Sequence, residues 1–296
     1  MKDITIIGGG PAAITAAIYA ARAKMTTTLV AEELGGYITK TDKIENYPGF
    51  KTITGLDLHK KLEEHLKDYD VEIIEETVIG VKQQENTVIV EFENGKKTES
   101  KTAIIATGSK RKKLGIKGEQ EYENKGVTYC AVCDGPIFQD QEVAVIGGSY
   151  AGTKSALYLS KIAKKVHILE IEKELSGEDL LIEQVKKTNN IEIITEAKIQ
   201  EIHGEEYVTG LIYKKNNERK QLRVQGITIE IGLIPNSDIV DVKKNAEGHI
   251  VIDDDMRTSS NKIFAAGDVT NKGPKQIIVA AAQGCIAALR AKEEIK

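Results

Sequence analysis

Cysteine is scarce in this chain, because its 296 residues include only three. So few cysteines in so long a chain exclude the disulfide scaffold of a small secreted domain. Long apolar runs are missing too, since none reaches the ~18 residues that a membrane span needs. The N-terminus passes from Met1 almost directly into the apolar run Ile4 to Ile7, which is not the layout of a signal peptide. We therefore expect a cytoplasmic protein with no membrane partner.

The chain has no excess of positive charge, because its formal net charge is −4. A nucleic-acid-binding protein needs a basic face, so nucleic acid is not expected as a partner. Hydrophobic residues make up 41% and charged residues 29% of the chain, which is the composition of an ordinary soluble globular protein. The length allows one large domain or two domains of ordinary size.

Two of the three cysteines stand close together in the stretch Tyr129-Cys130-Ala131-Val132-Cys133-Asp134-Gly135. A thiol pair at this spacing can close into a small disulfide ring and reopen, so it can carry two electrons. A structural zinc site is the interpretation from a different class of protein. Only Cys285 could add a third sulfur, whereas a closed zinc site usually needs four ligands, so we assign no metal.

A dinucleotide fingerprint stands near the start of the chain. The buried strand predicted at Ile4 to Ile7 runs into Gly8-Gly9-Gly10-Pro11-Ala12-Ala13, and a helix is predicted from Ile14 to Lys24. In this order of strand, turn and helix, the glycines allow a tight turn and a close approach to a pyrophosphate. The helix N-terminus supplies the positive end of a dipole for the phosphates. Glu32, just after a second predicted strand, is placed to bind a ribose hydroxyl.

The same pattern returns near the middle of the chain and predicts a second Rossmann-type unit. A strand predicted from Glu142 to Ile146 leads into Gly147-Gly148-Ser149-Tyr150-Ala151-Gly152 and a helix predicted from about Thr153 to Ile162. Ser149 replaces the second glycine, so we expect its side chain to crowd the pyrophosphate position. Glu170 suits a free ribose hydroxyl and repels a 2′-phosphate, which disfavours NADPH and leaves NADH open. A structural unit that binds no nicotinamide is the open alternative.

The C-terminal part of the chain adds short predicted strands. One strand is predicted from Gln221 to Ile231, and others at Ile250 to Ile252 and Ile263 to Ala266. The last of these runs into Gly267-Asp268, where a carboxylate at a strand end could bind a cofactor hydroxyl. An alanine-rich helix is predicted to begin at Lys275.

Taken together, these motifs resemble the low-molecular-weight thioredoxin reductases and, equally, the flavoprotein subunit of alkyl hydroperoxide reductase. The resemblance covers nearly the whole length of the chain. It rests on motifs that occur in family order: Gly8-Gly9-Gly10-Pro11-Ala12-Ala13, Gly35-Gly36, Glu45-Asn46-Tyr47-Pro48-Gly49, Ala106-Thr107-Gly108, Cys130-Ala131-Val132-Cys133-Asp134-Gly135, Gly267-Asp268 and Gln276.

The resemblance implies an α/β fold with two Rossmann-like, FAD/NAD(P)-binding domains of the three-layer ββα type, the second inserted into the first. The FAD-binding domain would comprise residues 1–114 and 242–296, and residues 115–241 would form a pyridine-nucleotide-type domain with the cysteine pair. A homodimer is implied as well. The residues implied to bind FAD are Gly8, Gly10, Pro11, Ala12, Ala13, Glu32, Gly35, Gly36, Tyr37, Asn46, Ala106, Thr107, Gly108, Gly267, Asp268, Lys275, Gln276 and Ile277.

The resemblance also implies a mechanism, that of a flavin-dependent thioredoxin reductase. Reduced FAD passes two electrons to the Cys130–Cys133 disulfide, and the dithiol then reduces a thioredoxin-like protein. Cys133 faces the flavin, Cys130 attacks the disulfide of the partner, and Asp134 donates and accepts the proton of the thiol. Thiol–disulfide exchange needs a thiolate that can reach the disulfide of the substrate, so Cys130 should be accessible.

Three departures from the family pattern concern the cofactors. Tyr37 stands where the family usually has glutamine, Ser149 interrupts the second fingerprint, and Glu170 stands where NADPH-dependent members carry a His-Arg-Arg run. The flavoproteins of peroxide reductases also have a glutamate there, and the resemblance to them implies NADH as the donor. Some family members from anaerobes have lost nicotinamide binding, and the resemblance to them implies ferredoxin or a deazaflavin as the electron donor. We therefore expect NADH or a protein such as ferredoxin as the donor, rather than NADPH.

Two alternatives for the whole protein stay open at this point. One is an NADH-dependent flavoprotein disulfide reductase that feeds a peroxiredoxin system. The other is a redox sensor or oxidase that binds flavin and has no thioredoxin partner.

Overall fold

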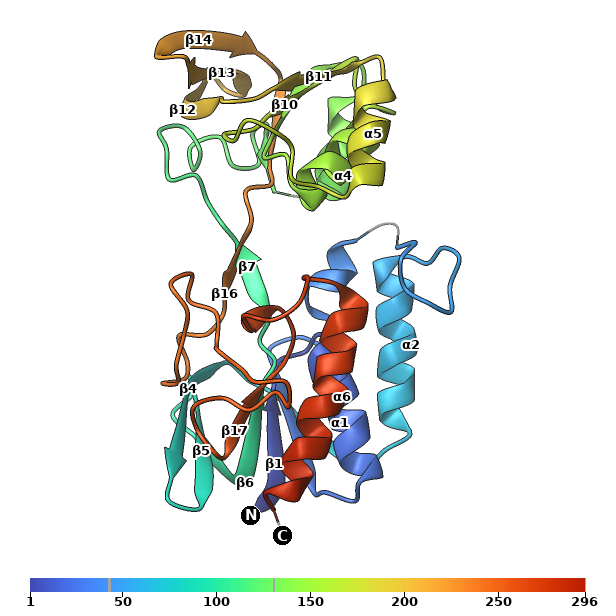
Figure 1. Cartoon of the computed structure of the whole chain (residues 1–296), viewed down its shortest axis with the longest axis vertical. Coiled ribbons are helices and arrows are strands. Elements are labelled where there is room, and N and C mark those ends of the chain that lie inside the picture. The colour runs from blue at the N-terminus through green and yellow to red at the C-terminus, as the bar shows by residue number, and fades with distance from the viewer. Residues whose placement is uncertain (42–43, 130, 296) are drawn as a thin grey trace. The chain divides into compact units, whose positions relative to one another are not determined.

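The computed structural model describes residues 1–41, 44–129 and 131–295, and only the backbone of Lys40, Val132 and Cys133. The chain forms two compact units, of which unit 1 comprises residues 1–110 and 234–296 and unit 2 comprises residues 111–233 (Figure 1). Unit 2 is therefore an insertion in unit 1. Both units are of α/β type, which confirms the predicted fold class.

Unit 1 is built on a seven-stranded sheet with the order β3-β2-β1-β6-β5-β4, and β17 also pairs with β6. The strands β1, β2, β3, β6 and β17 run parallel, whereas β4 and β5 form an antiparallel excursion. The carboxyl ends of the parallel strands therefore meet at one edge. The bounds are β1 Lys2–Ile7, β2 Thr27–Ala31, β3 Val71–Glu75, β4 Val78–Gln84, β5 Thr87–Phe92, β6 Lys97–Ile105 and β17 Ile263–Ala265.

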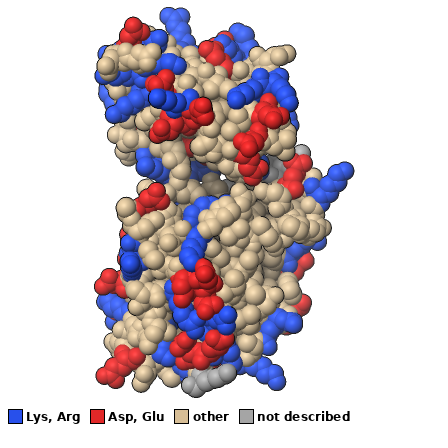
Figure 2. Space-filling model, in the orientation of Figure 1, with Lys and Arg blue, Asp and Glu red and all other residues tan. Residues whose placement is uncertain are grey.

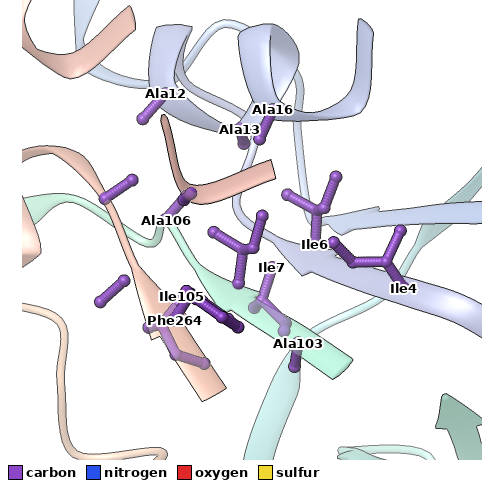
Figure 3. Packing of buried hydrophobic residues seen from close by; sticks show 14 of the residues in the cluster. Ile4, Ile6, Ile7, Ala12, Ala13, Ala16, Ala103, Ile105, Ala106 and Phe264 are labelled. Carbon is purple, nitrogen blue, oxygen red and sulfur yellow. The ribbon is translucent and has the colours of Figure 1, made fainter. Parts of the chain in front are cut away.

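The described residues of unit 1 form the helices α1 Pro11–Arg22, α2 Gly55–Lys67 and α6 Ile277–Glu293. Pro11 opens α1 at a position where its missing N–H costs no hydrogen bond. Ala13 and Ala16 of α1 are fully buried and lie on the side of the helix that faces the sheet (Figure 3). α6 packs closely on α1 at Gly284, where a Cβ would meet the Ala12 carbonyl oxygen at 2.1 Å. Small residues thus bring α1 close to the sheet and α6 close to α1.

Unit 2 repeats the arrangement with a five-stranded parallel sheet of order β11-β10-β9-β15-β8. The helix α4 follows β9 just as α1 follows β1, and a separate antiparallel sheet is formed by β12, β13 and β14. The bounds are β8 Val127–Thr128, α3 Ala131–Asp134, β9 Glu142–Ile146, α4 Tyr150–Leu159, β10 Lys165–Leu169, α5 Asp179–Lys187, β11 Ile191–Ile194, β12 Lys198–Gly204, β13 Val208–Lys215, β14 Glu218–Arg223 and β15 Gly226–Ile229.

The chain passes between the units along two short paired strands, β7 Ser109–Arg111 and β16 Leu233–Pro235. The expected domain boundaries, after residues 114 and 241, lie further along the chain than the boundaries of unit 2, which comprises residues 111–233. On the return path, Val240 and Val242 join the hydrophobic core of unit 1. Short 3-10 turns complete the structure: η1 Gly36–Lys40, η2 Gly135–Phe138 and η3 Gly267–Val269.

Two predicted strands differ in the structure. The run from Gln221 to Ile231 is not one strand, because β14 and β15 belong to different sheets. The chain turns between them, where the Val224 amide donates to Thr209 and the Gln225 amide to Glu142. The segment 250–252 forms isolated bridges at Ile250 rather than a strand. Apolar character was read correctly in both cases, since Val224 and Ile250 are fully buried, but hydrophobicity alone does not determine sheet pairing.

Acidic and basic side chains lie interspersed on the face shown in Figure 2. Arg257 forms ion pairs with Asp255 and Glu294. None of the helices in residues 1–41, 44–129 and 131–295 combines the length and the hydrophobicity that a bilayer crossing requires.

Candidate functional site

The first glycine turn lies at the carboxyl edge of the unit 1 sheet. Gly8 has φ +128°, which favours glycine, and a Cβ there would lie 2.2 Å from the Ala106 carbonyl oxygen. Its amide donates to Val30 at the end of β2, at 2.8 Å. The turns after β1, β2 and β6 therefore converge on Gly8. This is the edge at which open α/β sheets bind ligands.

Gly10 is the position where this turn is open. A Cβ at Gly10 would meet no atom within 4 Å, whereas the neighbouring Gly9 is closed by the Glu33 carbonyl oxygen. No side chain caps the N-terminus of α1, so the first amides of the helix are free to bind an anion. The cradle thus fits a dinucleotide diphosphate, and FAD is the dinucleotide that the resemblance implies. Gly36 lies beside Gly10, because a Cβ at Gly36 would lie 3.1 Å from the Gly10 Cα.

The C-terminal segment adds charged groups to unit 1 after β17. Asp268 is largely buried, and burial raises the pKa of its carboxyl despite the nearby Lys275 ammonium. Within the described part of the chain, no hydrogen bond to this carboxylate is found. An acceptor that is largely buried and has no hydrogen bond fits a ligand hydroxyl. Burial in turn lowers the pKa of Lys275, whose Nζ donates to the Thr270 carbonyl at 2.5 Å.

Other predicted FAD residues lie around this edge. Asn46 is tied to Gln276, the N-cap of α6, by a side-chain hydrogen bond of 3.0 Å. Glu32 is exposed at the end of β2, and Tyr37 is 42% exposed in η1. The Thr107 hydroxyl donates to the Asn236 carbonyl at 2.6 Å, so it is engaged within the protein.

Asn236 was missed by sequence reasoning. Its side chain donates to the Thr107 carbonyl at 3.0 Å, and its amide donates to the Gly108 carbonyl at 3.0 Å. It therefore shapes the turn after β6 from a position 129 residues away in the sequence. The residues before and after Asn236 carry no motif that could have predicted this contact.

The backbone of the second glycine turn is similar to that of the first, although their sequences differ. Gly147 has φ +107°, and a Cβ there would lie 2.2 Å from the Glu230 carbonyl oxygen, as at Gly8. Ser149, the N-cap of α4, has φ −75° and ψ −175°, whereas Gly10 has φ −83° and ψ −177°. The serine is therefore unstrained, and its side chain does not cap the helix. The backbone thus tolerates serine at this position, and the expectation that the Ser149 side chain crowds the pyrophosphate position stays a prediction.

Glu170 joins this turn directly. It is 7% exposed, and its Oε2 accepts a hydrogen bond from the Gly148 amide while Oε1 accepts one from the Glu172 amide at 3.0 Å. The carboxylate is thus fixed at the end of β10. Ile171 beside it is 61% exposed, which leaves an apolar surface next to the carboxylate.

The cysteine stretch follows β8. Cys130 lies outside the described residues, and Cys133 is described only by its backbone in α3. The Asp134 carboxylate is half-buried and accepts a hydrogen bond from the Thr128 hydroxyl. Gly135 packs on α4, because a Cβ there would lie 2.8 Å from the ring of Tyr158. Thr128 is a further residue that the sequence analysis did not single out.

Comparisons with known proteins agree with this architecture. The pattern of the pyridine nucleotide-disulphide oxidoreductase family matches residues 2–284. The chain is 40% identical over 298 residues to a Staphylococcus aureus protein named as a subunit of alkyl hydroperoxide reductase, covering 99% of the chain and 59% of that protein. It is 38% identical over 293 residues to a Bacillus subtilis protein named NADH dehydrogenase, covering 98% and 58%. The chain thus spans less than two thirds of the length of these curated relatives.

Solved structures are similar over the full length. The thioredoxin reductase of Lactococcus lactis is 36% identical with a TM-score of 0.95, covering 100% of this chain and 99% of that one. A ferredoxin-flavin thioredoxin reductase from Clostridium acetobutylicum is 33% identical with a TM-score of 0.55, covering 99% and 97%. The chain therefore belongs to the pyridine nucleotide-disulphide oxidoreductase family, and this membership implies FAD as its cofactor.

Proposed function

We propose that the chain is an FAD-dependent reductase of protein disulfides, with thioredoxin-like proteins as substrates. The observation that carries the proposal is the edge of the unit 1 sheet, where the open turn at Gly10 and the buried carboxylate of Asp268 follow parallel strands. Gly10 and the α1 N-terminus would hold the diphosphate, and Asp268 would accept a hydrogen bond from a hydroxyl of the cofactor. Bound there, FAD would supply two electrons for disulfide reduction.

The chemistry at the substrate disulfide belongs to Cys130 and Cys133. The Cys130 thiolate attacks one sulfur of the substrate, a mixed disulfide forms, and the other substrate sulfur leaves as a thiolate. Cys133 then attacks the mixed disulfide, which closes the Cys130–Cys133 disulfide and releases the second substrate thiolate. Asp134 would take up and return a proton, and its hydrogen bond from Thr128 holds the carboxylate in place.

For the electron donor, the geometry of Glu170 favours NADH. The carboxylate stands at the end of β10 beside an unstrained glycine turn, where it could accept a ribose hydroxyl. The same carboxylate would repel the 2′-phosphate of NADPH. A protein donor such as ferredoxin is the second candidate, because a ferredoxin-flavin thioredoxin reductase is among the similar structures.

Anaerobic stopped-flow mixing tests the donor. The protein reconstituted with FAD is mixed separately with NADH, NADPH and reduced ferredoxin, and the flavin absorbance is followed. We expect rapid bleaching by NADH and slow bleaching by NADPH. Rapid bleaching by NADPH would contradict the role given to Glu170, and bleaching by ferredoxin alone would assign the reaction to a protein donor.

The substrate is tested with the fully reduced protein. We expect it to reduce a bacterial thioredoxin in its disulfide form, and we expect Cys130→Ser and Cys133→Ser to abolish turnover while FAD stays bound. Reduction of a peroxiredoxin in preference to thioredoxin would support the alternative suggested by the alkyl hydroperoxide reductase relative. A protein that oxidises NADH but reduces neither partner would be a flavin-binding sensor or oxidase.

Three further properties belong to the same proposal. Unit 1 is the FAD-binding domain and unit 2 the pyridine-nucleotide-type domain. The protein acts in the cytoplasm, where thioredoxin-like substrates are kept reduced. It forms a homodimer, which sedimentation analysis of the FAD-loaded protein would test.

A further inference from the structure

Tyr129, the residue before Cys130, is anchored at its far end. Its hydroxyl donates to Glu119 Oε1 at 2.9 Å, and its half-buried ring packs against the hydrophobic cluster of unit 2. The Lys113 Nζ lies 5.3 Å from the centroid of the ring. Burial and the Glu119 carboxylate both raise the pKa of the Tyr129 phenol, so the hydroxyl remains a donor at physiological pH.

Glu119 is a buried carboxylate whose partners are hydrogen-bond donors. It is 3% exposed, and besides Tyr129 it accepts the amide of Leu114 at 2.8 Å and the amide of Gly115 at 2.6 Å. Among the ion pairs of the described residues, none involves Glu119. A buried carboxylate without a cation depends on each of its hydrogen bonds, which makes its position well defined.

Glu119 connects two parts of unit 2 that are distinct in sequence. Leu114 and Gly115 lie just after the chain has entered unit 2, whereas Tyr129 leads into the cysteine stretch. The loop between them is fixed on β12, because the Ile202 amide donates to the Lys117 carbonyl at 3.0 Å. Glu119, which binds the Tyr129 hydroxyl, therefore lies in a loop that is itself held on β12.

We propose that Glu119 and Tyr129 form a positioning pair that fixes where the chain enters the cysteine stretch. The inference rests on the proposed disulfide chemistry of Cys130 and Cys133. Tyr129 and Cys130 share a peptide bond, so an anchored tyrosine restricts the backbone that carries the attacking sulfur. Asp134 is held by Thr128 at the other end of the stretch. Small displacements of a reacting group can cost as much as ~100-fold in rate, so both anchors bear on exchange.

Two variants separate the contacts of this pair. Tyr129→Phe removes the hydroxyl and keeps the ring. Glu119→Gln can keep an oxygen toward Tyr129 and Leu114, but it turns an NH₂ group toward the Gly115 amide and loses that bond. The matched control is Tyr122→Phe, because Tyr122 is a buried tyrosine of the same cluster whose hydroxyl donates to the Gly204 carbonyl at 2.8 Å.

The test uses full-length protein reduced with a chemical dithiol and freed of it, so that neither the donor nor flavin turnover enters. Its readout is the single-turnover rate with a bacterial thioredoxin disulfide. We expect Tyr129→Phe to lower this rate about tenfold, which is well within the cost of misplacing a reacting group. We expect Glu119→Gln to lower the rate by a smaller factor, because the Tyr129 bond is kept while the Gly115 bond is lost, and we expect Tyr122→Phe to match the unchanged protein.

A second readout distinguishes positioning from stability and from failure of the proposed function. Alkylation by iodoacetamide, with peptide mapping to separate the three cysteines, should show an altered rate against pH at Cys130 in Tyr129→Phe and an unaltered one in Tyr122→Phe. Equal exchange and alkylation rates in the two tyrosine variants would overturn the proposal. If the unchanged protein fails to reduce thioredoxin, the proposed substrate is wrong, and the alkylation profile still decides the role of Tyr129.

Discussion

Asn46 donates a hydrogen bond from Nδ2 to Oε1 of Gln276 at 3.0 Å, across 230 residues of sequence. The bond joins the loop before α2 to the N-cap of α6. Both residues belong to the set expected to bind FAD, and the bond brings the first and the last segment of unit 1 together. FAD binding should therefore depend on this bond even if only one of the two side chains contacts the cofactor.

Asn46→Ala should weaken FAD retention by up to about tenfold, because a lost hydrogen bond costs about 0.5–1.5 kcal/mol. The measurement is the ratio of flavin to protein after dialysis, together with a titration of the apoprotein. Gln83→Ala is a matched control, since Gln83 donates to Asn261 at 2.8 Å in the same unit without a predicted FAD role. Equal FAD affinity in the two variants would mean that the Asn46 bond does not shape the site.

Gly8 and Gly10 should respond differently to alanine. Gly10→Ala places a methyl group in open space at an ordinary backbone angle, so the protein should fold normally and lose most of its FAD. Gly8→Ala combines φ +128° with a clash against Ala106, so the unfolding midpoint itself should fall, at a cost of roughly 1–2 kcal/mol or more. Circular dichroism melts and flavin content measure both effects. A Gly10→Ala protein with full flavin content would contradict the proposed diphosphate site.

Asp268→Asn should stabilise the apoprotein at neutral pH. Burial raises the pKa of Asp268 above its ordinary value of 3.8, so the folded state holds the proton more tightly than the unfolded state. Stability from this group is therefore present below pH 3.8 and is lost as pH rises through the raised pKa. The amide avoids that loss, and a gain of roughly 2–4 °C in the unfolding midpoint is expected for each kcal/mol recovered.

Thermal melts of apoprotein at pH 7 and near pH 4 test this sign, since the advantage of the amide should shrink at the lower pH. The same variant should bind FAD more weakly, because the charged acceptor for a ligand hydroxyl is gone. A variant that is less stable than the unchanged apoprotein at pH 7 would show that Asp268 has a stabilising partner within the protein.

The two Rossmann repeats could be predicted from the sequence because their signals are local. At both Gly8 and Gly147, a glycine at positive φ directly follows a strand and is closely followed by a helix, so the order of residues reveals the turn. At Ser149 the sequence reveals the residue type but not the backbone, which is an ordinary extended one at this N-cap. What the turn requires of that position is space on the ligand side.

The positioning residues could not be predicted, because their contacts link distant segments. Asn236 contacts Thr107 across 129 residues. Glu119 resembles any surface glutamate in sequence, yet it is one of the most buried charged residues of the chain. Such roles follow from tertiary packing rather than from residue spacing.

Glu170→Ala provides the sharpest test of the donor. If NADH binds at the second turn, loss of the carboxylate removes a charged acceptor for the ribose and frees the Gly148 amide. Hydrogen bonds to charged groups contribute about 1.5–3 kcal/mol, so flavin reduction at low NADH should slow by about ten- to a hundredfold. Reduction by dithionite, which needs no binding site, should be unchanged, and so should reduction by NADH in the exposed-surface control Glu183→Ala.

The same variant separates the two donor classes. A protein donor such as ferredoxin makes no use of the β10 carboxylate as a ribose acceptor, so its rate should survive Glu170→Ala. Equal rates of flavin reduction by NADH in Glu170→Ala and the unchanged protein would show that NADH does not bind at the second turn. In that case Glu170 would serve only to hold the turn together through the amides of Gly148 and Glu172, and the repeated fold of unit 2 would function as the carrier of the cysteine pair.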